Sequence, residues 1–268
     1  MSDLQNLRPA EALYLIRPKV EAWDAMAVSL ANLFYHEVVA LAQSRHVDPM
    51  VKTPVVRMVP GRLFQTTPLR DFESCLIRPL LKGAKGLFFS QLAEQAWKNG
   101  EGLKYRRMVG KSDAFLPISG LAEALGALGL KKNYPKGNAS LKSQVLVEDL
   151  HFRQEFPNLV KHKPLEAIQV LDGMQGRWLV LDHSGDFRLE LSAMKELGNQ
   201  LDSMVKLQPQ ALSGLGLNYD PGKRLESKRL DLTIRLKRII GKKLRNIYEE
   251  EHDSSTTDMA MGMLIDLG

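Results

Sequence analysis

The stretch Glu21–Ser44, EAWDAMAVSLANLFYHEVVALAQS, carries the clearest secondary-structure signal in the chain. Its apolar residues recur at spacings of three and four and would form one stripe along an α-helix. They are Trp23, Met26, Ala27, Leu30, Leu33, Phe34, Val38 and Leu41. A membrane span needs about 18 uninterrupted apolar residues, and this stretch is interrupted at Ser29, Asn32, His36 and Glu37. We therefore predict a long, buried helix over 21–44.

Patterns on both sides of this stretch predict a mainly α protein with small β-hairpins. Pro9 opens a short helix, because its missing N–H is harmless in a first helical turn. The β-branched run Val55–Val59 and the run Leu63–Gln65 flank a Pro-Gly turn, so we expect them to pair as a hairpin. Trp178–Asp182 is expected to be a strand within a mixed α/β region at 144–210.

One part of the sequence is similar to a known family. The stretches Leu7–Ile16 and Ala25–Leu33 look like the opening of winged-helix-like cytoplasmic modules in a family of predicted bacterial membrane proteins of unknown function. Phe72–Leu81, Leu87–Leu92 and Leu121–Leu130 resemble the next unit and its closing helix. The resemblance covers residues 7–130 and implies a tandem or variant winged-helix body at 7–143. It carries no functional residues over to this chain.

Composition places the chain among ordinary globular proteins. Its 268 residues are 44% hydrophobic and 25% charged, which is enough apolar material to bury a core. A single cysteine, Cys75, forms no internal disulfide, and Met1–Lys19 lacks the basic head and apolar run of a signal peptide. We therefore expect a soluble, cytoplasmic protein.

The positive charge of the chain is concentrated near its end. Ten basic and two acidic residues give the segment 223–248 a net charge of +8, and since the whole chain carries +6, the rest carries −2. Apolar residues at helical spacing run through the same segment, so we predict a long basic amphipathic helix at 223–248 with one buried apolar stripe. The expected stripe consists of Leu225, Leu232, Leu236, Ile239, Ile240, Leu244 and Ile247. A flexible Met-rich tail is expected at 253–268. The basic helix is expected to bind polyanions through Arg224, Lys228, Arg235, Lys237, Arg238, Lys242, Lys243 and Arg245.

Motifs for catalysis fail on spacing. Gly110-Lys111-Ser112 resembles the end of a phosphate-binding loop, but Tyr105 stands where that motif needs a glycine. The six histidines include no pair at i,i+4, so no metal site is expected. Cys75 lies on an apolar helix stripe and is expected to be inert. We expect no catalytic site, no cofactor and no small-molecule substrate.

Two functions fit these observations, and an enzyme with a pocket that the sequence does not reveal is a third, weaker candidate. The first is a non-catalytic binding or adaptor protein whose basic helix contacts an acidic protein or an anionic membrane surface. The alternative is a winged-helix nucleic-acid-binding protein. In the alternative, further phosphate contacts would come from Lys104, Arg106, Arg107, Lys131 and Lys132.

Overall fold

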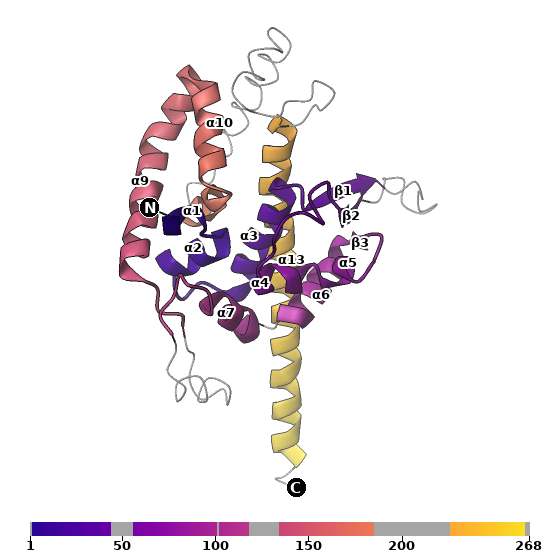
Figure 1. The fold of residues 1–268 in the computed structure, drawn as a ribbon. Coiled ribbons are helices and arrows are strands. Elements are labelled where there is room, and N and C mark those ends of the chain that lie inside the picture. Colours follow the sequence, from indigo (N-terminus) through magenta and orange to yellow (C-terminus); the bar gives the residue numbers. More distant parts are fainter. Residues whose placement is uncertain (1, 44–55, 101, 118–133, 185–225, 266–268) are drawn as a thin grey trace.

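A computed structural model describes residues 2–43, 56–100, 102–117, 134–184 and 226–265 (Figure 1). This part of the chain is mainly helical and contains a three-stranded antiparallel sheet in the order β1-β2-β3. The helices before the sheet are α1 (Ser2–Gln5), α2 (Pro9–Ile16) and α3 (Ala22–Tyr35). Mainly α structure with a small β element is therefore confirmed, whereas the winged-helix interpretation of residues 7–143 stays a prediction.

Helix α3 lies at the centre of the core. Most of its side chains are buried, including Met26 and Leu30, and α2, α7 (Gly102–Gly110) and the C-terminal helix α13 (Glu226–Ile265) pack around it. Its small residues allow neighbouring backbones to approach closely. A Cβ atom added to Gly241 of α13 would lie 3.5 Å from the Cβ atom of Ala27.

The sequence-based helix over 21–44 was wrong in its second half, because α3 ends at Tyr35. The backbone N–H groups of Glu37 and Val38 donate to the carbonyl oxygens of Phe34 and Leu33, at 3.0 and 2.9 Å. This is a Schellman motif, in which Glu37 adopts φ = 55°, a left-handed conformation that usually favours glycine. The chain then continues as strand β1 (Val39–Gln43).

The predicted hairpin was also wrong in its partner. Strand β2 (Val56–Pro60) pairs with β1, with Leu41 opposite Met58, and on its other side with β3 (Leu87–Phe88). Residues 63–65 form a turn instead. Helices α4 (Asp71–Leu76), α5 (Arg78–Leu81) and α6 (Phe89–Gly100) complete this side of the molecule.

After residue 138, all the regular secondary structure in the described residues is helical. Helices α9 (Ala139–His162) and α10 (Pro164–Gly173) lead into the 3₁₀ helix η1 (Arg177–Ser184), so the strand predicted at Trp178–Asp182 is wrong. Residue 143, the expected domain boundary, lies inside α9. The Arg177 guanidinium donates to both carboxylate oxygens of Glu148, at 2.6 and 2.7 Å, and thereby holds η1 against α9. Residues 185–210 of the predicted mixed region lie outside the described residues.

The buried thiol of Cys75 gives a test of this packing. Cys75 is 1% exposed, its Sγ atom donates to the Phe72 carbonyl oxygen, and burial raises the pKa of the thiol to about 12. Because the thiolate is the nucleophile, we expect a thiol reagent to label the native protein at least about a hundredfold more slowly than the denatured chain. Equal labelling rates in buffer and in denaturant would contradict this packing. The double variant Cys75→Ala with Ser90→Cys, which places the thiol at an exposed position of α6, serves as the fast-reacting control.

Candidate polyanion-binding surface

Helix α13 is fixed on the body by one apolar face. Ile234, Leu236, Ile240 and Leu244 are each 5% exposed or less, and the helix packs mainly on α3 and α6. Of the predicted basic helix at 223–248, residues 226–248 lie within α13, and residues 223–225 fall outside the described residues. The helix is longer than expected, because residues 253–265, for which we expected a flexible tail, are helical too. Residues 266–268 lie outside the described residues.

An aromatic cluster anchors the middle of α13. Tyr248 packs between Trp23 of α3 and Trp97 of α6, with ring centroids 4.7 and 5.8 Å apart. The indole N–H of Trp97 donates to a carboxylate oxygen of Glu251 at 2.7 Å. Sequence reasoning missed this cluster, because nothing in the local pattern links three aromatic residues so far apart in the chain.

One predicted site residue, Lys237, faces the interior. Its side chain is buried, and its ammonium group donates to the carbonyl oxygen of Leu179 in η1 at 3.0 Å. Burial raises the pKa of the nearby Asp24 carboxyl, and the positive charges of Lys237 and Arg245 oppose that rise. Lys237 is therefore a structural cation between α13 and the body, and its assignment to a polyanion-binding surface was wrong.

Four of the other predicted cations lie on the outer side of α13. Arg235, Arg238, Lys242 and Arg245 are exposed, and Lys243 is half-buried. Residues seven apart lie on nearly the same side of a helix, which aligns Arg235 with Lys242 and Arg238 with Arg245. We call these four residues the basic strip. Lys228 lies near the start of α13, and Arg224 falls outside the described residues.

Apolar and acidic side chains border the basic strip. Leu232 and Ile239, also seven residues apart, are 41% and 46% exposed, although the sequence pattern placed both on the buried stripe. At the far end, Arg245 donates to the Glu249 carboxylate at 2.8 Å. The outer face of α13 therefore offers positive charge beside accessible apolar surface, and an exposed ion pair marks one end of it.

Other kinds of site find less support in the described residues. Within these ranges, no group of three or more His, Cys, Asp or Glu side chains could hold a metal ion. Arg106, expected to contact phosphates in the nucleic-acid alternative, is buried and donates to the carbonyl oxygen of Val20 at 2.9 Å. Lys131 and Lys132 fall outside the described residues.

The described helices also bear on membrane insertion and on relatives. None of the helices that the structure describes combines the length and the apolar character needed to cross a bilayer. No protein-family model, no curated protein and no solved structure matches this chain.

Proposed function

We propose that this chain is a non-catalytic, cytoplasmic adaptor that contacts an acidic partner, either a protein or an anionic membrane surface, through the basic strip of α13. The observation that carries the proposal is the division of α13 into two faces. Its buried apolar residues and Lys237 hold the helix on the body. The four side chains of the basic strip are exposed instead, and they belong to a segment, 223–248, with a net charge of +8.

The borders of the basic strip favour an acidic protein or a lipid surface over a nucleic-acid duplex. Phosphates along a duplex attract cations, and they offer no apolar surface to Leu232 and Ile239. A membrane interface or an amphipathic protein surface offers both negative charge and apolar groups. The burial of Arg106 removes one of the additional phosphate contacts that the nucleic-acid alternative requires.

Charge removal at the centre of the basic strip tests this proposal. We expect Arg235→Gln with Lys242→Gln to weaken binding to phosphatidylserine-containing vesicles by about thirtyfold, since each basic residue near an anionic surface contributes roughly 1 kcal/mol. Sedimentation with vesicles at low and high salt measures the effect. The matched control is Lys136→Gln with Lys161→Gln, which removes the same charge from exposed positions outside α13.

The outcomes separate the candidate partners. Binding to acidic vesicles that is lost in the strip variant and kept in the control supports a membrane surface. Binding to duplex DNA with a steep salt dependence, but not to vesicles, would replace the proposal with the nucleic-acid alternative. Equal behaviour of the two double variants toward vesicles and toward an acidic polypeptide such as polyglutamate would reject the basic strip as a binding surface.

A further inference from the structure

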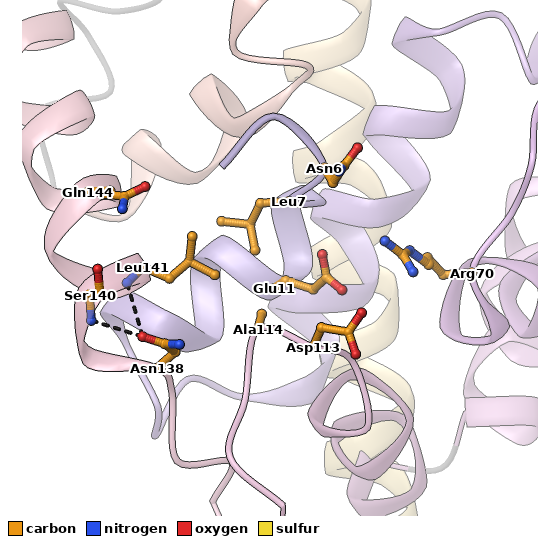
Figure 2. Close-up of a pocket in the computed structure, with 10 residues that line it drawn as sticks. All are labelled: Asn6, Leu7, Glu11, Arg70, Asp113, Ala114, Asn138, Ser140, Leu141 and Gln144. Carbon is orange, nitrogen blue, oxygen red and sulfur yellow. Dashed lines mark hydrogen bonds between the residues drawn. The ribbon is translucent and has the colours of Figure 1, made fainter. Parts of the chain in front are cut away.

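A polar cavity lies on the opposite side of α3 from α13. It has a volume of about 260 Å³ and opens where α2, α4 and α9 begin (Figure 2). Its lining includes the charged side chains Glu11, Arg70 and Asp113 and the apolar side chains Leu7 and Leu141. The charged residues gather at one side of the cavity and the two leucines lie toward the other.

The Glu11 side chain is largely buried, and one of its two carboxylate oxygens has no partner among the described residues. The side chain is 2% exposed, and its Oε2 atom accepts a hydrogen bond from the backbone N–H of Arg8 at 2.6 Å. Its Oε1 atom accepts no hydrogen bond from the described residues, and no described cation lies within 4 Å of it. Glu11 lines the cavity, and a ligand that displaces water from it must supply this carboxylate with a cation or a hydrogen-bond donor.

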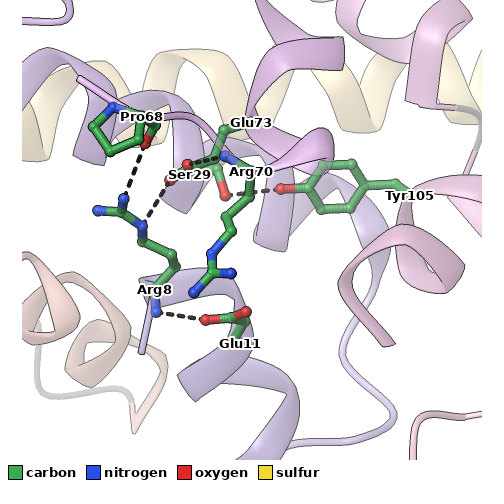
Figure 3. Close-up of polar contacts among 7 residues, drawn as sticks. All are labelled: Arg8, Glu11, Ser29, Pro68, Arg70, Glu73 and Tyr105. Atoms are coloured by element: carbon green, nitrogen blue, oxygen red, sulfur yellow. Dashed lines mark hydrogen bonds and ion pairs between the residues drawn. The ribbon is translucent and has the colours of Figure 1, made fainter. Parts of the chain in front are cut away.

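Glu73 shows how the same arrangement looks when it is complete (Figure 3). Like Glu11, it is the third residue of its helix, is 1% exposed and accepts from the backbone N–H of the residue before the helix, Arg70, at 3.0 Å. In addition, Glu73 has a counterion, because the Arg8 guanidinium lies 3.8 Å from it. Glu11 lacks such a counterion among the described residues and faces the cavity instead.

Arg70 and Asp113 add two more charged groups with unused capacity. Both side chains are exposed and line the cavity, and neither has a hydrogen-bond or ion-pair partner for its charged group among the described residues. Two carboxylates and one guanidinium therefore meet at this space, with a formal charge of −1. An anion alone would face both carboxylates, and an apolar ligand would leave Glu11 buried without a partner.

We propose that this cavity binds a small zwitterion of the size of an amino acid. Its ammonium group would lie between Glu11 and Asp113, its carboxylate would face Arg70, and its apolar part would contact Leu7 and Leu141. The volume fits such a ligand, because 260 Å³ is about the space of nine water molecules and lies just below the usual range for drug-sized ligands. This site is independent of the basic strip.

The test compares L-leucine with two analogues that each lack one charged group. By isothermal titration calorimetry of the full chain, we expect L-leucine to bind more tightly than 3-methylbutylamine, which has no carboxylate, and 4-methylpentanoate, which has no amine. Glu11→Gln should weaken L-leucine binding by about ten- to a hundredfold, the usual contribution of a charged hydrogen bond. Glutamine at this position still accepts from the Arg8 N–H, so the helix cap is kept.

Glu73→Gln is the matched control, because it removes a buried capping carboxylate that does not line the cavity. We expect it to keep L-leucine binding. If Glu11→Gln does not fold, Arg70→Gln replaces it, and this exposed substitution should abolish the preference for L-leucine over 3-methylbutylamine. Absence of L-leucine binding to the unaltered chain at millimolar concentration, or equal losses in Glu11→Gln and Glu73→Gln, would overturn the proposal.

Discussion

Removal of residues 223–268 is expected to abolish cooperative folding of the remaining chain, in addition to any binding by the basic strip. Helix α13 inserts Ile234, Leu236, Ile240 and Leu244 into the core beside α3. Full burial of such a side chain contributes about 1.5–3 kcal/mol, so the four together contribute roughly 6–12 kcal/mol. Whole domains are stable by only about 5–15 kcal/mol, so the shortened chain should have little stability left.

Thermal unfolding followed by circular dichroism measures this effect. The matched control is a chain that ends after Asp253, which keeps Tyr248, Glu251 and the four apolar residues of α13. We expect the control to unfold in one sharp transition and the shorter chain to show a broad or absent one. A sharp transition in the chain that lacks 223–268 would mean that α13 is an accessory element. If the shorter chain shows the broad or absent transition that we expect, its loss of binding would reflect loss of the fold. The basic strip must then be tested by point substitutions.

The sequence predicted correctly those elements whose apolar spacing fits only one type of secondary structure. The first half of the 21–44 stretch is helical because Trp23 to Phe34 fit a helix and little else. Beyond Tyr35, Val38 and Leu41 continue the same spacing, yet they belong to the turn and strand that follow α3. The Schellman motif that ends α3 uses a glutamate where glycine is usual, so no local signal marked the end.

In a short apolar run, the sequence pattern predicted the wrong type of secondary structure. Trp178–Val180 is buried and could form either a strand or a helix, since a run of this length has no period that separates the two. The sheet partners of β2 could not be predicted from the local sequence either. The Pro-Gly turn suggested Leu63–Gln65 as the partner, but β2 pairs with β1 and β3, which are more distant in the sequence.

The basic strip was predictable as a concentration of charge, but not as a surface. The spacing of α13 allows two overlapping stripes, and the stripe chosen from the sequence includes Leu232 and Ile239, which are exposed. The buried face instead includes Thr233 and Lys237, and Lys237 is tolerated there because its ammonium group donates a hydrogen bond to the Leu179 carbonyl oxygen. The cavity beside Glu11 had no signal in the sequence, since its charged residues come from three separate segments.

The turn that links α3 to the sheet leads to a second large expected effect. Gly61→Ala should destabilise the protein by about 3 kcal/mol, because a Cβ atom at this position would overlap the Glu37 carbonyl oxygen and lie 2.8 Å from the carbonyl carbon. Both neighbours are backbone atoms, and they are held by hydrogen bonds from Gly61 N–H to the Val38 oxygen and from Leu63 N–H to the Glu37 oxygen, at 2.9 and 3.0 Å. The added Cβ atom would therefore meet backbone atoms, which cannot rotate away as a flexible side chain could.

Thermal unfolding of Gly61→Ala beside Gly173→Ala separates this clash from a general effect of alanine. Gly173 ends α10, and nothing lies within 4 Å of a Cβ atom added there, so its variant should stay within about 0.5 kcal/mol of the unaltered chain. For Gly61→Ala, we expect a midpoint lower by roughly 8 °C. Equal midpoints for the two variants would mean that the 37–63 turn yields easily. In that case, the hydrogen bonds between residues 37–38 and 61–63 would not hold Glu37 rigidly, and they would not determine the direction in which β1 follows α3.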